Sequence, residues 1–353
     1  MSQLKLVLAG VVGLPCLIAS AVLVAPLMAV LSIPPLLLLI FRSESRTAIP
    51  DQVIIAGGSS GIGLCIAKEC VKRGISKITL LARNLDRLKE AKEELEALAE
   101  TVPSTNKKNV CQIEIVSVSV SDYEAVSKAA RELNIPPTDR VVLWNCAGFA
   151  YPREFEQVPI AKFEEQIMTN QIGTMYLVRA FLPYLHEGLI VLTSSATGQL
   201  GVYGYTAYAP TKFAIRGFAE TLHAELIRTH PRLRIQLAFP IDTDTPGYQE
   251  ELKTTPAITR KLSETAGLAT PEQTGKAMVD AAFTTNPKFQ VYFTFEGWML
   301  SNATAGLGPV TNMADAITQV ALAGLLRLIG LFVLNDWWNI IRNFPEKEVT
   351  KKD

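Results

Sequence analysis

The sequence predicts an α/β fold with a doubly wound, Rossmann-like parallel sheet, an N-terminal membrane anchor and a C-terminal apolar helix. Short apolar runs alternate with helical patterns through the middle of the chain, as in parallel sheets covered on both faces. A glycine-rich loop follows the first run, and long apolar segments occupy both ends. We expect an anchor over residues 1–47, one cofactor-binding domain over 48–300 and a C-terminal segment over 301–353.

Six apolar runs predict the strands of this sheet. They cover residues 53–56, 78–82, 112–118, 141–145, 189–193 and 234–239. The intervening segments are long enough for crossover helices. A further helix start is predicted near residue 270, where Thr270 would be the cap, Pro271 the first helical residue and Gln273 the partner in a capping box.

Composition narrows the class of protein. The chain has 353 residues and a formal net charge of +0, so nothing in its charge suggests a nucleic-acid-binding protein. Five scattered cysteines without a C-x-x-C pair, and three histidines, indicate neither a disulfide framework nor a metal site. Unpaired cysteines favour a reducing compartment for the catalytic part.

Long apolar segments lie at the two ends of the chain. Residues 6–41 contain no charge and exceed the roughly 20 residues of one membrane helix, which predicts an anchor as a single helix or a shallow hairpin. The second segment, near the C-terminus, contains Arg327 and Asp336, and such charges argue against a clean span. Trp337 and Trp338 suit a membrane interface. Packing on the anchor or on a second subunit, in a homo-oligomer, is the alternative.

The loop "AGGSSGIG" after the first strand predicts a phosphate site. Its glycines allow a tight turn and close backbone approach to a pyrophosphate, which would sit at the N-terminus of the following helix. Two serine hydroxyls can add donors. The predicted cofactor contacts in this loop are Gly57, Ser59, Ser60, Gly61 and Gly63.

An arginine at the end of the second strand indicates which dinucleotide binds. Arg83 lies 20 residues after Gly63, with Arg87 close behind, and "LLARN" contains no acidic residue. An acidic residue here would bind the ribose of NAD, whereas arginine accommodates the 2′-phosphate of NADP. The sequence therefore predicts NADPH. A purely structural arginine is the alternative.

Tyr208 and Lys212 stand four residues apart in "YAPTK". Alone, such a pair is usually part of a surface helix. Ser195, however, ends a predicted strand 13 residues earlier, Asn170 lies in the preceding helical segment, and Asn145 closes the fourth strand. Ligands bind at the carboxyl ends of parallel strands, so these residues can face one substrate.

In this order the residues resemble the short-chain dehydrogenase/reductase family, over residues 50 to 285. The resemblance implies a catalytic tetrad of Asn170, Ser195, Tyr208 and Lys212. Tyr208 would protonate the carbonyl oxygen, Ser195 would hydrogen-bond it, and Lys212 would bind the cofactor ribose and lower the pKa of the tyrosine. Asn170 would support a proton-relay water, and Asn145 would lie at the cofactor.

Some positions depart from the family pattern. Ala56 stands where threonine is common before the glycine loop, Cys146 where a second asparagine is common, and Ser119 where an aspartate usually meets the adenine. Ser194 adjoins Ser195, so spacing alone chooses between the two serines.

The segments "DTDTPG", "LLARN" and "GQLGVYGYTAYAPTKFAIRGFAE" resemble the 3-ketodihydrosphingosine reductase branch of the family. This implies NADPH-dependent reduction of a long-chain keto-amine lipid, 3-oxosphinganine, at the endoplasmic reticulum membrane with the catalytic domain in the cytosol. Thr243 or Thr245 would hold the cofactor carboxamide, and the loop to Leu268 would cover the substrate. The "NAT" sequon at Asn302 would then stay unglycosylated. A membrane-bound reductase of retinoids, steroids or fatty acyl chains, and a non-catalytic NADPH-binding scaffold, are the alternatives.

Overall fold

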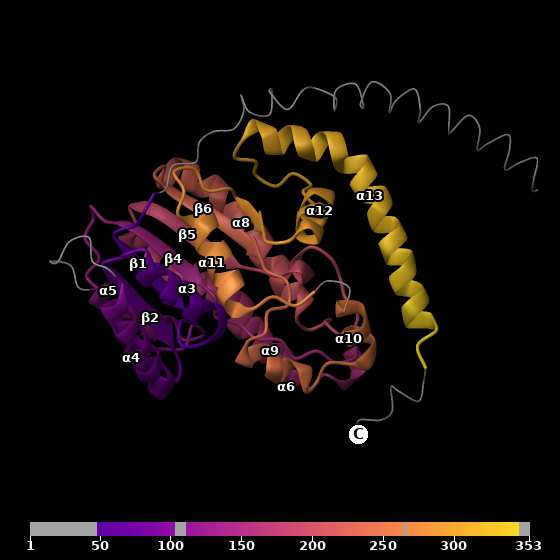
Figure 1. Cartoon of the computed structure of the whole chain (residues 1–353), viewed down its shortest axis with the longest axis horizontal. Coiled ribbons are helices and arrows are strands. Elements are labelled where there is room, and N and C mark those ends of the chain that lie inside the picture. Colours follow the sequence, from indigo (N-terminus) through magenta and orange to yellow (C-terminus); the bar gives the residue numbers. More distant parts are fainter. Residues whose placement is uncertain (1–47, 103–110, 265–266, 346–353) are drawn as a thin grey trace, which may run out of the picture.

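The computed structural model describes residues 48–102, 111–264 and 267–345, so the predicted anchor over residues 1–47 lies outside the described part. The centre is a sheet of seven parallel strands in the order β3-β2-β1-β4-β5-β6-β7 (Figure 1). The strands are β1 (Gln52–Ala56), β2 (Lys77–Ala82), β3 (Gln112–Ser117), β4 (Arg140–Asn145), β5 (Glu187–Thr193), β6 (Leu233–Phe239) and β7 (Gln290–Tyr292).

The six predicted strands are confirmed, each within two residues of its predicted bounds. Their apolar runs form strands because both faces of the sheet are covered, and β1 is buried along its whole length. The seventh strand was not predicted. β7 is three residues long and pairs only with the end of β6, which is too short for a periodic signal.

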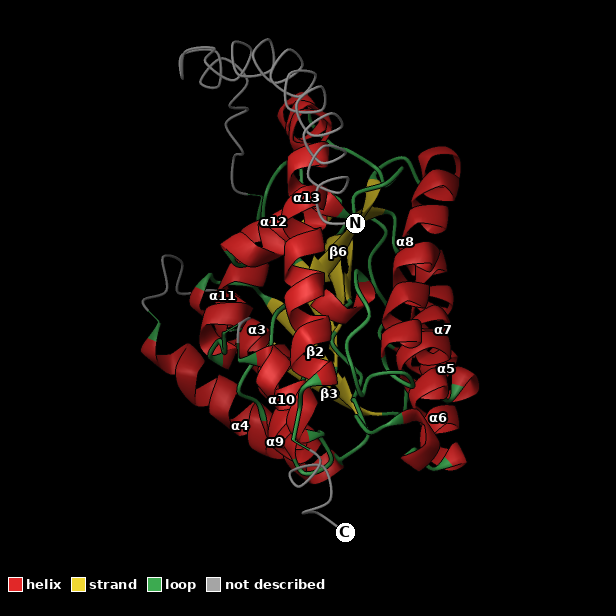
Figure 2. Ribbon diagram, turned by 90° about the vertical axis from the view of Figure 1, so that its right-hand side faces the viewer, coloured by secondary structure: helices red, strands yellow, loops and turns green. Residues whose placement is uncertain are grey.

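Helices cover the sheet in two layers (Figure 2). One layer holds α5 (Tyr123–Glu132), α7 (Gly173–Phe181) and α8 (Ala209–Thr229), and the other holds α3 (Gly61–Lys72), α4 (Leu85–Thr101) and α11 (Pro271–Ala282). Each layer packs its apolar side chains against one face of the strands. The doubly wound prediction is confirmed.

Helix α11 begins at the predicted residue. The Thr270 hydroxyl accepts a hydrogen bond from the backbone N–H of Gln273 at 3.2 Å, and the Gln273 side chain accepts one from the N–H of Thr270 at 3.1 Å. This capping box satisfies two N–H groups that a helix start leaves unpaired. It fixes where the chain leaves the loop before α11.

The remaining helices gather beside one end of the sheet (Figure 1). They are α6 (Ile160–Gln166), α9 (Pro246–Leu252), α10 (Ala257–Ser263), α12 (Phe295–Ala303) and α13 (Met313–Arg342). Helix α13 packs against α12 and α10. The boundary expected at residue 300 lies inside α12.

Helix α13 confirms the predicted C-terminal apolar helix. It has 30 residues, and in the described part of the chain it alone is long and apolar enough to cross a membrane. Of the residues in its most apolar stretch, only 6% are buried. Nearby, Asn302 on α12 is buried and its side-chain amide donates to the carbonyl of Trp298 at 2.7 Å.

Candidate active site

A cavity of about 800 Å³ opens where the strands end. It begins at the glycine loop after β1, passes Ser195 and Tyr208, and ends between α12 and α13. The sheet order reverses between β1 and β4, and ligands of doubly wound sheets bind in the crevice at such a switch point.

The glycine loop fits a pyrophosphate. Gly57 and Gly61 have φ values of +81° and +55°, which side chains rarely adopt. A Cβ atom at Gly57 would lie 2.8 Å from the backbone nitrogen of Ala147, and one at Gly63 would lie 2.2 Å from the carbonyl oxygen of Gly57. Helix α3 starts here, and its cap residue Ser60 makes no side-chain capping bond. The first N–H groups of α3 are therefore open to an anion in the cavity.

The two predicted arginines lie on the cavity wall after β2. Arg83 and Arg87 are exposed, line the cavity, and form no ion pair with any residue that the structure describes. Asn84, which the sequence did not single out, caps α4 by accepting from the N–H of Arg87 at 3.0 Å. The Ser117 hydroxyl donates to the carbonyl of Arg83 at 3.1 Å. These bonds fix the backbone and leave both guanidinium groups free for an anion.

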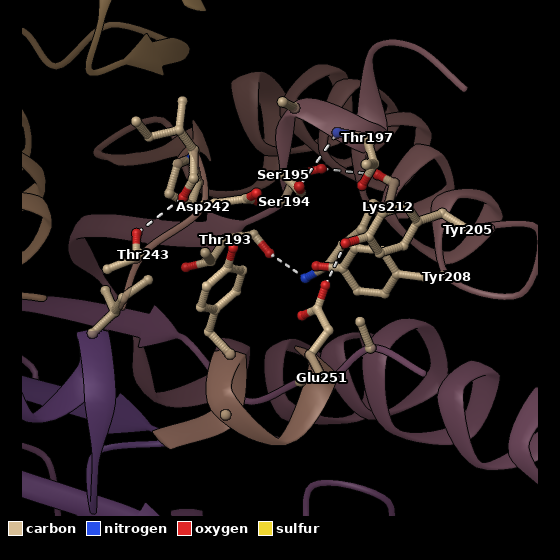
Figure 3. Close-up of a pocket in the computed structure, with 18 of the residues that line it drawn as sticks. Thr193, Ser194, Ser195, Thr197, Tyr205, Tyr208, Lys212, Asp242, Thr243 and Glu251 are labelled. Atoms are coloured by element: carbon tan, nitrogen blue, oxygen red, sulfur yellow. Dashed lines mark hydrogen bonds between the residues drawn. The ribbon is translucent and has the colours of Figure 1, made fainter. Parts of the chain in front are cut away.

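Tyr208 and Lys212 meet at the start of α8, and Figure 3 shows them facing the cavity. Tyr208 is the N-cap residue of the helix, without a side-chain capping bond, and Pro210 occupies the first turn, where no N–H partner is lost. The Nζ atom of Lys212 donates to the Thr193 carbonyl at 3.0 Å and lies 5.4 Å from the centre of the Tyr208 ring. The Ser195 side chain lies beside the phenol and lowers its pKa.

The geometry separates the two adjacent serines. Ser194 is buried, and its hydroxyl donates to the carbonyl of Lys212 at 3.0 Å. Ser195 accepts from the N–H of Thr197 at 3.3 Å and contacts Tyr208. Ser194 therefore anchors α8 to the end of β5, and Ser195 is the serine placed to meet a carbonyl beside the phenol.

The electrostatics of the phenol differ from the expectation. Burial and the Glu251 carboxylate raise the pKa of Tyr208, and the Ser195 side chain lowers it. The net effect of these neighbours is to raise the pKa of Tyr208, whereas Lys212 was expected to lower it. The pKa rises because desolvation disfavours the charged phenolate. Burial also lowers the pKa of Lys212 to about 8. The tyrosine is therefore held in its protonated form, which is the form of a proton donor.

Asn170 and Asn145 do not line the cavity, although residues beside each of them do. Asn170 is fully buried in a π-helical turn, Ile167–Ile172. Its side chain accepts from the N–H of Phe149 at 3.0 Å and donates to the Phe149 carbonyl at 2.9 Å. Asn145 donates to the Thr174 hydroxyl at 2.7 Å. Both asparagines shape the loop after β4 in this structure.

Two threonines close the cavity beyond β6. Thr243 is buried, and its hydroxyl donates to the Ile241 carbonyl at 2.9 Å and lies 3.1 Å from the hydroxyl of Thr274. Thr245 caps α9 through the N–H of Tyr248 at 3.1 Å. Both line the cavity, so both stay candidates for a carboxamide contact.

Sequence reasoning missed a group of polar residues near Tyr208 and the far wall of the cavity. Tyr205, Asp242 and Glu251 line the cavity beside the phenol, and α12 and α13 close its far end. No motif places these residues together, because Asp242 and Glu251 follow β6 whereas Tyr205 precedes α8. Their proximity to the tyrosine is a product of the fold.

Comparison with known proteins agrees with this geometry. The sequence profile described as short chain dehydrogenase matches residues 51–255. The chain belongs to the short-chain dehydrogenase family. This short-chain dehydrogenase is similar to the 3-ketodihydrosphingosine reductase of Mus musculus, with 42% identity over 92% of this chain and 95% of that protein. The 3-dehydrosphinganine reductase of Danio rerio is 41% identical over 82% of this chain and 85% of its own length.

Solved structures share the fold. An alcohol dehydrogenase from Thermococcus sibiricus, complexed with 5-hydroxy-NADP, has 25% identity and a TM-score of 0.53 over 65% of this chain and 88% of that one. A levodione reductase, at 21% identity, has a TM-score of 0.56 over 67% of this chain and 92% of that one. The short-chain dehydrogenase binds a nicotinamide cofactor as its family does, and the glycine loop and the open start of α3 fit that group.

Proposed function

We propose that this short-chain dehydrogenase reduces 3-ketodihydrosphingosine (3-oxosphinganine) to sphinganine with NADPH. One observation carries the proposal: a single cavity joins the glycine loop, the Tyr208 hydroxyl and an apolar wall built by α12 and α13. The reduction of a keto lipid needs all three regions, for the cofactor, the proton donor and the lipid tail. The identity to reductases of this name, over more than nine tenths of both chains for the mouse protein, supports the same substrate.

The arginines after β2 support NADPH over NADH. Arg83 and Arg87 line the cavity without an ion-pair partner in the described chain, and a 2′-phosphate would supply their anion. Arg87 lies in the first turn of α4, where a cation is unfavourable unless an anion accompanies it. When bound, the cofactor supplies the hydride.

The residues at the start of α8 handle the proton. Tyr208 gives its phenolic proton to the carbonyl oxygen as the alcohol forms, and its raised pKa keeps that proton available at neutral pH. Ser195 hydrogen-bonds the same oxygen and holds it against the phenol. Lys212, fixed by the Thr193 carbonyl, supplies the positive charge that stabilises the phenolate left when Tyr208 gives up its proton. Asn170 positions the Phe149 segment and the start of α8 through Thr211, 3.2 Å away.

Helix α13 accounts for the lipid tail. Its cavity face consists of Leu326, Arg327, Ile329, Gly330, Val333, Leu334 and Trp337. These residues recur at the spacing of one helical stripe, and all but Arg327 are uncharged. Apolar side chains on other faces are exposed, among them Ile317, Val320, Leu325, Leu328, Leu331 and Phe332. A helix that is apolar on both sides suits a bilayer on its outer face and an acyl chain on its cavity face.

The same helix supports the proposed membrane association. The domain would lie on the endoplasmic reticulum membrane, facing the cytosol, with α13 in the interface and residues 1–47 as the anchor. Arg327 and Asp336 sit within α13, and this favours a helix lying in the interface over one that spans the bilayer. A second subunit packed on the exposed face, in a homo-oligomer, would cover the same side chains.

Turnover of a defined substrate tests the proposal. The full-length protein, purified in detergent, is mixed with NADPH and 3-ketodihydrosphingosine, and sphinganine is measured by mass spectrometry. We expect stoichiometric sphinganine and NADP⁺, and slower reaction with NADH. Retinoid, steroid and fatty acyl carbonyls serve as competing substrates. If one of these is reduced and the keto-amine is not, the proposed substrate is wrong. Cofactor binding without reduction of any carbonyl would leave only the scaffold.

A further inference from the structure

A carboxylate lies beside the proposed proton donor. Glu251, on α9, lines the cavity and points toward Tyr208 and Lys212 (Figure 3). Its side chain accepts a hydrogen bond from the Tyr205 hydroxyl, and the rings of Tyr205 and Tyr208 lie 5.6 Å apart. Among the residues that the structure describes, Glu251 has no ion-pair partner. A half-buried carboxylate without a salt bridge is costly to keep.

The local charge is unbalanced toward negative. Asp242 lines the same part of the cavity, and its carboxylate adds to burial in raising the pKa of Glu251 to about 7, whereas Lys212 lowers it. Two carboxylates and one ammonium leave one negative charge uncompensated when all three are ionised. A cationic ligand in the cavity would balance it.

The proposed substrate carries such a charge in the right place. In a 2-amino-3-ketone the ammonium sits on the carbon next to the carbonyl, so a group that binds the ammonium must lie beside the group that protonates the carbonyl oxygen. Glu251 has this relation to Tyr208. We infer that Glu251 binds the substrate ammonium and makes the enzyme select keto-amines over other long-chain ketones. This inference rests on the proposed function and names a substrate-binding residue for it.

A purely structural role is the competing explanation. The bond to Tyr205 ties α9 to the loop before α8, so loss of Glu251 could simply loosen the cavity. The two roles differ in their dependence on the amine. A structural defect lowers the reduction of every substrate by a similar factor, whereas loss of an ammonium site affects only the substrate that bears the charge.

The experiment compares two substrates of the same chain length. One is 3-ketodihydrosphingosine, and the other is the matched 1-hydroxy-3-ketone without the amino group. Wild type, Glu251→Gln and the control Glu250→Gln are assayed for kcat/KM with both. Glu250 is the neighbour on α9, is exposed, and pairs only with Lys253 among described residues. NADPH affinity, measured by fluorescence, reports whether each variant is folded.

We expect wild type to prefer the keto-amine and Glu251→Gln to lose roughly 10- to 150-fold of its kcat/KM for that substrate, the effect of one charge-assisted hydrogen bond. The amine-free ketone should change less than about threefold, and Glu250→Gln should behave as wild type. Equal losses for both substrates would assign Glu251 a structural role. A wild type that reduces both ketones equally well would also overturn the inference, while leaving the proposed reaction intact. Failure of the wild type with both ketones would instead overturn the proposed reaction.

A second measurement needs no variant. Dodecylamine and dodecanol, tested as inhibitors of the wild-type enzyme, share a tail and differ in the charged head. The amine should inhibit more strongly, and its advantage should shrink below pH 7 as Glu251 takes up a proton. Tyr205, Tyr208, Asp242 and Lys212 face the same carboxylate, so the comparison is made at each pH against the alcohol. Equal inhibition by both compounds would contradict the ammonium site.

Discussion

The two ends of the cavity are built in different ways. At the cofactor end, the glycine loop and the start of α3 come from one continuous stretch after β1, Gly57 to Gly63. At the substrate end, Tyr205, Glu251 and Gly330 belong to segments far apart in the chain, and only the fold brings them to one cavity. Close backbone approach fixes the first end, and packing of α13 against α12 and α10 fixes the second. The cofactor end tolerates little change, whereas the substrate end can be altered with selective effects.

We expect the largest effect on activity from Tyr208, which lies where the cofactor end and the substrate end of the cavity meet. Tyr208→Phe should leave NADPH affinity close to that of wild type and lower kcat by about 10²- to 10⁴-fold, since it removes the proton donor and little volume. Stopped-flow turnover and fluorescence titration of NADPH measure the two quantities. Lys212→Met should impair both, because the ammonium belongs to the cofactor end as well. Rates near those of wild type in Tyr208→Phe would end the proposed mechanism.

The next effect tests the cofactor end alone. Arg83→Asp should raise the KM for NADPH roughly 10- to 150-fold relative to that for NADH, the range for losing a charge-assisted hydrogen bond. Sphinganine formation with each cofactor gives the ratio. Lys89→Asp is the control, because Lys89 is exposed on α4 and does not line the cavity among the described residues. An unchanged cofactor ratio in Arg83→Asp would make this arginine structural.

A smaller effect tests the substrate end. Gly330 lies on the cavity face of α13, and a Cβ atom there would meet nothing within 4 Å. Gly330→Phe should fill space meant for the lipid tail and lower kcat/KM for the long-chain ketone by about 10-fold, the equivalent of roughly two buried methylene groups. Short-chain ketones should react as in wild type.

Gly324→Phe is the matched control for this test. Gly324 lies on the same helix, is also free of neighbours within 4 Å, and does not line the cavity. If both variants lower the rate equally, or if the short-chain ketone loses as much as the long one, α13 does not hold the tail.

The smallest effect concerns stability. Burial raises the pKa of Glu251 from 4.5 to about 7, so between these values the folded state holds a proton that the unfolded state has released. The free energy of unfolding therefore falls as pH rises through this window. Glu251→Gln removes the titrating carboxylate, and with it this loss of stability at higher pH. Its Tm should exceed that of wild type more at pH 8 than at pH 5, by roughly 2–4 °C for each kcal/mol regained. A difference in Tm that does not vary with pH would show that Glu251 is not the titrating group.

The sequence predicted the glycine loop at the cofactor end because the constraints on that loop are local. Glycines with positive φ, a strand before them and a helix after them leave a readable pattern at Gly57 and Gly61. The Thr270 capping box was predictable for the same reason. The roles of Tyr208 and Lys212 came from resemblance to a family, and the geometry then separated Ser195 from Ser194 through the bond of Ser194 to the backbone of α8.

The sequence could not reveal contacts between residues that lie far apart in the chain. Glu251 is an ordinary acidic residue in "YQEEL", and nothing in that stretch says that Tyr205 lies against it. The raised pKa of Tyr208 likewise depends on burial and on Glu251, neither of which spacing along the chain reveals. The sequence also could not show which face of α13 lines the cavity, because a helix that is apolar all round does not indicate which face packs against its neighbours.

The burial of Asn302 has a consequence for mapping the orientation of the protein in a membrane. The nitrogen that would carry a glycan already donates to Trp298 inside α12, and acceptor asparagines belong on exposed surfaces. An unmodified Asn302 is therefore the expected result on either side of the membrane. A reporter belongs elsewhere: Ile227→Asn, at a residue 64% exposed on α8, creates the acceptor triplet Asn-Arg-Thr away from the cavity. Its modification in microsomes, read beside protease access to the domain, reports the compartment directly.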